Sequence, residues 1–164
     1  MNLIELKNFK RFQDINIEIK EKGLTLVSGV NNSGKTSILH ALAVWEYAKI
    51  LLINYRGYDS LLKDFDVSKQ GLGIATESFL PISIPSVKYL WKNQKTNGSY
   101  DLKIKVGWED QGESLFLELA YTLNGNNFAI KKSHSNIKEE HKIPTIAYLP
   151  PFGGMDTNEA VVVN

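Results

Sequence analysis

The sequence contains no cysteine and no long hydrophobic run. The absence of thiols excludes a disulfide framework and thiolate metal sites, and it fits a reducing compartment. Apolar stretches such as Ile50 to Ile53 are far too short to cross a bilayer. The first residues alternate in polarity and carry charges, unlike a secretory signal. We therefore expect a cytoplasmic protein with no membrane partner.

Arginine is also scarce, and the charges nearly balance. Arg11 and Arg56 are the two arginines, and the formal net charge is +1. Such a balance gives no support for a broad nucleic-acid-binding surface. The 164 residues, 43% of them hydrophobic and 23% charged, are ordinary for one globular domain with a sizeable core.

One stretch has the pattern of a phosphate-binding loop. Gly29 to Thr36 reads Gly-Val-Asn-Asn-Ser-Gly-Lys-Thr, which has the spacing G-x-x-x-x-G-K-[ST]. The apolar run from Leu24 to Val27 predicts a buried strand before the loop. Apolar residues near a 3.6-residue period predict a helix after it, from about Lys35 to Asn54, with Gly57 as its C-cap. The order strand, loop and helix is the context that the motif requires.

The chemistry of this loop predicts a site for ATP and Mg²⁺. Gly29 and Gly34 allow tight turns that bring backbone N–H groups close to a polyphosphate, and the helix N-terminus attracts the same anion. Lys35 is expected to reach the β- and γ-phosphates, and the Thr36 hydroxyl is expected to hold Mg²⁺, so these two are the predicted catalytic residues. The predicted nucleotide-binding residues of the loop are Gly29, Asn31, Asn32, Ser33, Gly34, Lys35, Thr36 and Ser37.

Two other parts of the chain have the pattern of antiparallel strands. Leu3 to Lys7 predicts a first strand, and the alternation from Ile15 to Ile19 predicts a half-buried second strand. Residues from Leu102 to Ile130 alternate with a period of two, with turns at 110–112 and 124–126, and predict a meander. Strands so close before the phosphate loop indicate that an antiparallel sheet flanks the nucleotide fold.

Residues 57–100 have little periodicity and are interpreted as an irregular insertion. Ser60 to Phe65 and Val87 to Trp91 each predict a short helical turn, and Gly71-Leu72-Gly73 interrupts the segment between them. Segments of this length without a pattern are usually functional or mobile.

The segment after the meander combines a polar and an apolar part. Lys131 to Lys142 predicts a solvated loop, in which His134 and His141 are too far apart to suggest a metal site. Ile143 to Leu149 predicts a last apolar strand.

Three side chains of the predicted helix have two interpretations each. Trp45 and Tyr47 have the rings of a base-stacking platform, but their helical spacing is more typical of a core or interface. His40, one turn into the helix, is more typical of a solvated or core residue than of a ligand.

The segment Ile4 to Phe12, ending in Asn-Phe-Lys-Arg-Phe, together with the phosphate loop, resembles the N-terminus of ABC-type ATPases of the SMC, RecF and overcoming-lysogenization-defect (OLD) groups. The resemblance is specific over residues 3–50. Asn32 departs from the glycine typical of SMC heads and is closer to OLD-like ATPases; asparagine tolerates a left-handed backbone well. The resemblance implies ATP and Mg²⁺ as cofactors and places Lys10 and Arg11 beside the phosphates.

Several parts of such an ATPase are missing from the sequence. Ile146 to Pro150 resembles the strand that leads to the Q-loop, but Pro151 stands near the position of the glutamine. Leu115 to Glu118 is the nearest imitation of a Walker B strand, yet its alternation predicts a meander strand and no second acid follows. No LSGG-like signature segment occurs.

We therefore predict an α/β fold: one N-terminal lobe of a P-loop ATPase over residues 1–164, as part of a longer protein. Its parts are residues 1–56 with the loop and first helix, the insertion 57–100, and the meander and last strand over 101–149. The resemblance implies a role in DNA repair or phage defence through ATP-dependent association. The expected partners are nucleotide, a missing C-terminal half or further copies of the chain, and DNA through the full-length protein.

Two other interpretations stay open. A self-contained small P-loop kinase would use Lys35 and Thr36 for direct phosphoryl transfer, but such kinases usually have arginine-rich lids, and neither arginine here has a lid-like position. A non-catalytic binding module would hold nucleotide only to bias an interface.

Overall fold

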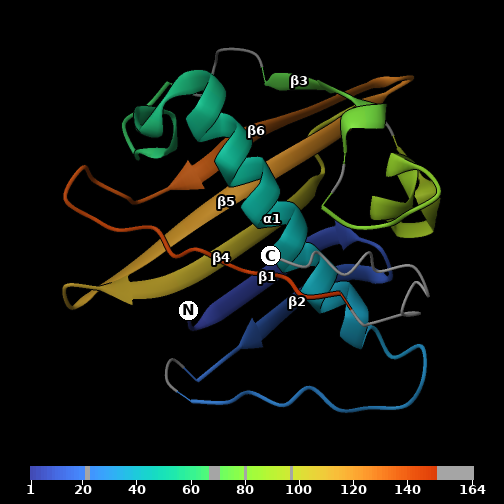
Figure 1. Ribbon diagram of the computed structural model, residues 1–164, viewed down its shortest axis with the longest axis horizontal. Helices are drawn as coiled ribbons and strands as arrows, with labels where there is room; N and C mark the ends of the chain where they lie inside the picture. The colour runs from blue at the N-terminus through green and yellow to red at the C-terminus, as the bar shows by residue number, and fades with distance from the viewer. Residues whose placement is uncertain (21–22, 67–70, 80, 97, 151–164) are drawn as a thin grey trace, which may run out of the picture.

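The computed structural model describes residues 1–20, 23–66, 71–79, 81–96 and 98–150. Its described strands form one six-stranded antiparallel sheet in the order β2-β1-β4-β5-β6-β3, and the long helix α1 crosses one face of it (Figure 1). The architecture is therefore α/β, with the antiparallel sheet that the sequence predicts. The strands are β1 (Leu3–Phe9), β2 (Phe12–Glu18), β3 (Leu72–Ala75), β4 (Leu102–Asp110), β5 (Glu113–Asn124) and β6 (Asn127–Ser135).

The N-terminal hairpin confirms the first two predicted strands. β1 and β2 pair from Leu3 opposite Glu18 to Phe9 opposite Phe12, so Lys10 and Arg11 form the turn. Ile4 and Leu6 are fully buried, because alternate residues of a strand point to the same face of the sheet. β1 also pairs with β4, which joins the hairpin to the meander in one continuous sheet.

The meander is confirmed, but its last strand is longer than predicted. β6 continues to Ser135, so the prediction of a solvated loop from Lys131 to Lys142 is wrong for its first five residues. Lys132 is buried because its ammonium donates hydrogen bonds to the carbonyl oxygens of Leu62 and Phe65, the second at 3.2 Å. His141 is also buried, 4% exposed, which corrects its interpretation as part of a solvated loop.

The insertion contains one strand that the sequence pattern does not predict. β3 pairs with β6 at the edge of the sheet and includes Gly73, a residue that weakens strands and is tolerated best at edges. The expected turn near Val87 is confirmed as a 3₁₀ helix, and another covers part of the expected Ser60–Phe65 turn. The short helices are η1 (Tyr58–Leu61), η2 (Thr76–Ser78), η3 (Val87–Leu90) and η4 (Lys92–Gln94).

Helix α1 (Lys35–Arg56) begins where predicted and ends two residues later than predicted. Gly57 caps it with φ 80°, and its N–H donates to the Ile53 carbonyl at 2.8 Å. Trp45 is 0% exposed and its indole N–H donates to the Leu117 carbonyl at 3.1 Å, so Trp45 is core. Tyr47 is half-buried and packs edge-on against Phe79, as expected of an interface residue rather than a stacking platform.

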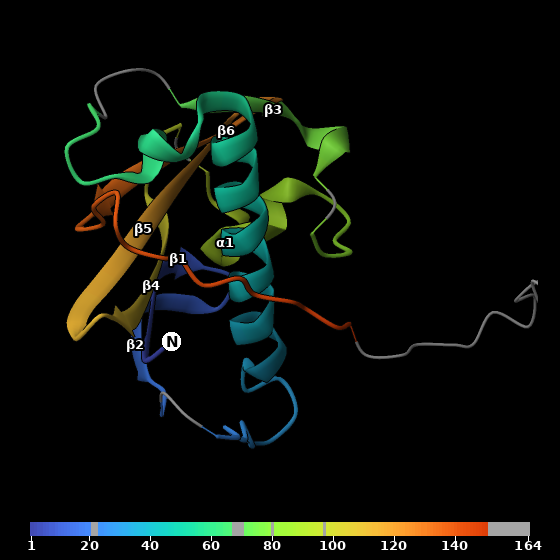
Figure 2. The ribbon, with the colours of Figure 1, turned by 60° about the vertical axis from the view of Figure 1, so that its left-hand side comes forward.

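By length and composition, α1 is also the one described helix that could cross a bilayer. Half of its most apolar window is buried inside the protein, and a core helix meets the same criteria. Figure 2 shows α1 lying along the sheet, with the segment after residue 142 passing over it.

Two segments that the sequence predicts as strands form none. Leu24 to Val27 has no strand pairing, and Leu24 and Leu26 are 93% and 84% exposed. Ile143 to Leu149 is extended without a strand partner, although Ile143 and Ile146 pack against the core. A strand needs a neighbour that pairs with its backbone, and the described part of the chain gives neither segment one.

Candidate functional site

The phosphate loop is closed around its own lysine. The Lys35 ammonium donates to the carbonyl oxygens of Gly29 and Val30 at 2.6 and 2.8 Å. Ser33 N–H donates to the Val30 carbonyl at 3.2 Å, which turns the chain toward the helix. These bonds tie the beginning of the loop to the first turn of α1 and hold the lysine at the site where a polyphosphate would bind.

Two loop positions depend on an unusual backbone conformation. Asn32 has φ 63°, the left-handed conformation that asparagine tolerates better than other residues with a Cβ. Gly34 has φ 102°, and a Cβ at Gly34 would lie 2.6 Å from Phe12 Cζ and 2.8 Å from Arg11 Cδ. The loop can therefore adopt this shape only because glycine occupies position 34.

The N-terminus of α1 is free to receive an anion. Its N-cap is Gly34, no side chain caps the first turn, and that turn contains no acidic residue. The first amides of the helix thus have no side-chain acceptor, and the helix dipole adds positive potential there. Thr36 is exposed and Ser37 is half-buried in this first turn. Asn31, like Asn32, lies on the exposed part of the loop.

The residues present fit ATP with Mg²⁺. The phosphates would be held by the uncapped N-terminus of α1, by the backbone at Gly34, where no Cβ fits, and by the Lys35 ammonium. The Thr36 hydroxyl would be a ligand of the metal. The described residues contain no group of three or more His, Cys, Asp or Glu side chains that could hold a metal by themselves. Mg²⁺ is often bound in this way, by few protein groups and the phosphates of its nucleotide.

The turn between β1 and β2 lies against the loop. Arg11 and Phe12 pack beside Gly34, so closely that a side chain at position 34 would collide with both. Lys10 is half-buried, and its ammonium forms a hydrogen bond with Nδ1 of His40. The structure thus brings both cations of the Asn-Phe-Lys-Arg segment to the N-terminal part of α1, while contact of either with nucleotide stays a prediction.

His40 is the neighbour that the sequence pattern did not reveal. Burial, with a smaller effect of the Lys10 charge, lowers its pKa from 6.5 to about 4. Burial also lowers the pKa of Lys10. At neutral pH an uncharged imidazole therefore accepts a hydrogen bond from the ammonium. A signal was available, because His40 follows Thr36 by four residues and the two share one face of the helix.

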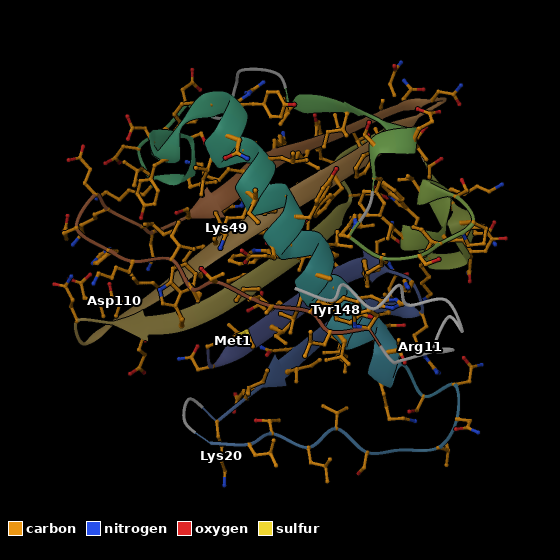
Figure 3. The ribbon with its side chains drawn as sticks, in the orientation of Figure 1. Met1, Arg11, Lys20, Lys49, Asp110 and Tyr148 are labelled. Carbon is orange, nitrogen blue, oxygen red and sulfur yellow. The ribbon has the colours of Figure 1, made fainter. Side chains whose placement is uncertain are left out.

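A buried ion pair on α1 holds the C-terminal segment. Glu46 and Lys49 are 2.8 Å apart, and both side chains are less than a tenth exposed. Lys49 Nζ donates to the Pro144 carbonyl at 2.7 Å, and the Ile146 N–H donates to a Glu46 carboxylate oxygen at 3.1 Å. These contacts replace the strand pairing that the segment lacks (Figure 3 labels Lys49 on α1 and Tyr148 on the segment that passes over it). Pro151, the approximate Q-loop position, lies outside the described residues.

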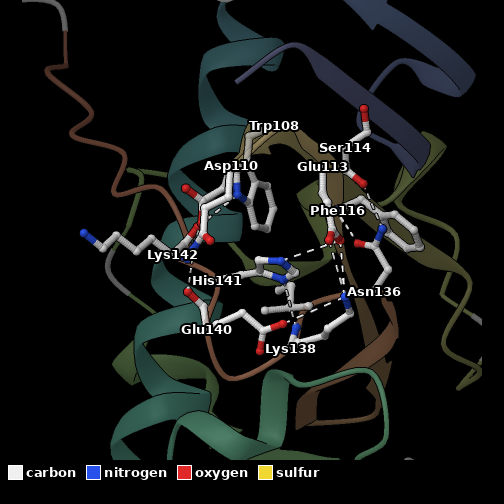
Figure 4. Close-up of polar contacts among 12 residues, drawn as sticks. Trp108, Asp110, Glu113, Ser114, Phe116, Asn136, Lys138, Glu140, His141 and Lys142 are labelled. Atoms are coloured by element: carbon white, nitrogen blue, oxygen red, sulfur yellow. Dashed lines mark hydrogen bonds and ion pairs between the residues drawn. The ribbon is translucent and has the colours of Figure 1, made fainter.

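A second polar cluster fixes the chain just before that segment. His141 Nδ1 accepts the Lys138 N–H at 3.1 Å, and its Nε2 lies 3.7 Å from Glu113 Oε2 (Figure 4). Lys142 N–H donates to Asp110 at 2.8 Å, and the Trp108 indole donates to the Lys142 carbonyl at 2.9 Å. The cluster attaches the chain at 138–142 to the β4–β5 hairpin, so its role is structural.

Glu118, the nearest imitation of a Walker B acid, does not face the helix that carries the phosphate loop. It alternates with Leu117 and Leu119, which are buried, and so lies on the sheet face away from α1. Burial alone would raise the pKa of Glu118, but hydrogen bonds from Ser133, His134 and Lys103 lower it. The carboxylate is paired with Lys103 at 3.0 Å, which confirms Glu118 as a meander residue.

Comparison with known proteins places the chain in a family. The sequence model of the AAA ATPase domain family matches residues 1–142, which include the phosphate loop, α1 and the meander. No curated protein matches the chain significantly. The match covers most of the 164 residues. The chain therefore belongs to the AAA ATPase domain family and has the N-terminal region of an ABC-like ATPase that the resemblance predicted.

Proposed function

We propose that the chain is the ATP-binding half of an SMC- or OLD-like ATPase. The single observation that carries this proposal is the loop closed by Lys35 at the uncapped N-terminus of α1. ATP would bind with its phosphates on the first-turn amides and Lys35, and Thr36 would hold Mg²⁺. The wider role, in DNA repair or phage defence, rests on the family resemblance alone.

Nucleotide binding can be tested by titration calorimetry with MgATP. Lys35→Ala is expected to remove most of the binding, because it removes the cation that would contact the β- and γ-phosphates. Lys63→Ala is the matched control, since Lys63 is exposed and follows η1, at the other end of α1 from the loop. Thermal unfolding of both variants checks that the fold persists. Equal affinity in the wild type and Lys35→Ala would contradict the proposal.

We propose further that the chain alone hydrolyses ATP negligibly. Hydrolysis needs one acid to hold the metal and another to orient water, whereas the first turn of α1 has no acidic residue and the described residues include no group of three or more His, Cys, Asp or Glu side chains. Phosphate release at about 1 per second or faster, lost in Lys35→Ala, would contradict this and favour the kinase or a complete ATPase. Binding without turnover also fits the non-catalytic module. In the ATPase that we propose, the C-terminal half would supply the missing groups.

The exposed apolar residues before the loop support a further partner. Leu24 and Leu26 before the loop are 93% and 84% exposed, and Val30 inside it is 80% exposed. Large apolar side chains exposed close together in the sequence are typical of interaction sites. We propose that the C-terminal half of the ATPase covers them by pairing with Leu24 to Val27. Supplying that half as a separate polypeptide should give a complex that Leu26→Lys weakens. Self-association of the chain alone, weakened by the same substitution, would favour a second copy instead.

A further inference from the structure

Lys10, His40 and Tyr148 form one cluster at the N-terminal part of α1. Lys10 comes from the β1–β2 turn, His40 from the second turn of the helix, and Tyr148 from the extended segment after residue 142. The Lys10 ammonium is hydrogen-bonded to His40 Nδ1. The rings of His40 and Tyr148 meet edge to face, with their centroids 5.8 Å apart and an interplanar angle of 84°. Three segments far apart in sequence therefore meet at the His40 side chain.

The backbone of Lys10 is fixed as firmly as its side chain. Lys10 has φ 49°, a left-handed conformation that is unfavourable for a residue with a Cβ. Its N–H donates to the Leu90 carbonyl at 2.7 Å, which holds the turn against η3. Unfavourable backbone conformations persist where surrounding contacts impose them, and they concentrate at functional sites.

His40 is suited to hold an ammonium because its neutral ring accepts a hydrogen bond and does not repel the positive charge. Burial and the nearby Lys10 charge lower the pKa of His40 to about 4, so the ring is neutral at pH 7. With Nδ1 accepting from Lys10, the ring proton of the neutral form is on Nε2. Tyr148 packs edge to face against the ring, and its own segment is anchored to the helix by Glu46 and Lys49.

The cluster lies one helical turn from the predicted metal ligand. Thr36 and His40 are four residues apart, so their side chains lie one turn apart on the same face of α1. An ammonium held at His40 adds positive charge close to the place where the triphosphate would bind.

We propose that His40, supported by Tyr148, is a positioning residue that holds the Lys10 ammonium where it attracts the phosphates of the bound nucleotide. This inference rests on the proposed nucleotide binding. In this proposal Lys10 attracts the phosphates electrostatically. His40 and Tyr148 do not contact the nucleotide and act only by positioning the Lys10 ammonium.

The test is a double-mutant cycle on MgATP affinity, measured by calorimetry at low salt. Lys10→Ala and His40→Ala are each expected to weaken binding roughly fivefold, and the double variant no more than Lys10→Ala alone. His40→Asn is expected to restore much of the affinity, because its amide oxygen can accept the same hydrogen bond. His134→Ala, at an exposed histidine on β6, is the matched control and should bind as the wild type does.

Tyr148→Ala provides a second arm that leaves the helix sequence intact, and it should weaken binding by roughly twofold only while Lys10 is present. Additive effects of Lys10→Ala and His40→Ala would overturn the proposal, as would unchanged affinity in both single variants. Stronger binding by His40→Ala would also overturn it, because it would mean that the histidine withholds the ammonium. Lys35→Ala separates the two ideas: if it too binds normally, the proposed nucleotide site itself has failed.

Discussion

The meander and the segment before the phosphate loop both have strand-like sequences, but only the meander forms strands. The meander from β4 to β6 is fully paired, and Leu117 and Leu119 within it are buried against the core. Leu24 to Val27 is more apolar and richer in β-branched residues than the meander strands, yet it is exposed and unpaired. The difference is not local preference, because each meander strand has its neighbour next in sequence while the loop strand has none nearby. Strand formation here depends on available partners.

The largest expected effect lies in the meander. Leu117→Ala should lower the free energy of unfolding by about 3–5 kcal/mol, because a fully buried leucine leaves a cavity that the sheet and α1 cannot close. Urea denaturation followed by circular dichroism measures the loss. A change below about 1 kcal/mol would mean that the sheet and helix are packed less tightly than the structure indicates.

A smaller but clear effect is expected where a buried ion pair substitutes for strand pairing. Lys49→Met should destabilise the protein by about 3 kcal/mol, because it leaves the Glu46 carboxylate buried without its cation and releases the Pro144 carbonyl. Urea denaturation measures it. Lys63→Met is the control, since Lys63 and Asp64 form an exposed pair at 3.9 Å whose loss should change little. Equal effects of the two substitutions would contradict the anchoring of residues 143–149.

These contacts indicate how far the sequence could lead. Period-two and 3.6-residue patterns predicted β1, β2, α1 and the meander, because neighbours in the chain supply their partners. The loop followed from its motif. The polar pattern predicts solvated positions for Lys132 and His141, and it fails because their burial depends on carbonyls and carboxylates of distant segments. The contact of Lys10 with His40 joins residues 30 apart in the sequence, and no local pattern encodes it.

The titration of His40 should give a still smaller effect. Its folded pKa of about 4 lies below the unfolded value of 6.5, so its contribution to stability is complete above pH 6.5 and is lost as the pH falls toward 4. Because the ring is partly solvent-exposed, we expect about 1 kcal/mol, well below the full value of the shift. The wild type should therefore lose more stability than His40→Asn between pH 7.5 and 4.5, as measured by urea denaturation. Parallel losses in the two proteins would contradict a half-buried ring that stays neutral at pH 7.

The smallest effect on the free energy of unfolding is expected in the unpaired segment Leu24 to Val27. Leu26→Ala makes the same chemical change as Leu117→Ala, but Leu26 is 84% exposed, so the free energy of unfolding of the chain alone should change by less than about 0.5 kcal/mol. The pair of variants thus measures the same substitution with and without strand partners. If the C-terminal half of the ATPase covers Leu24 to Val27, adding it should make Leu26→Ala costly, while the cost of Leu117→Ala stays as it was. A loss of several kcal/mol from Leu26→Ala in the chain alone would mean that the segment is already buried in solution, by a contact that the isolated fold does not contain.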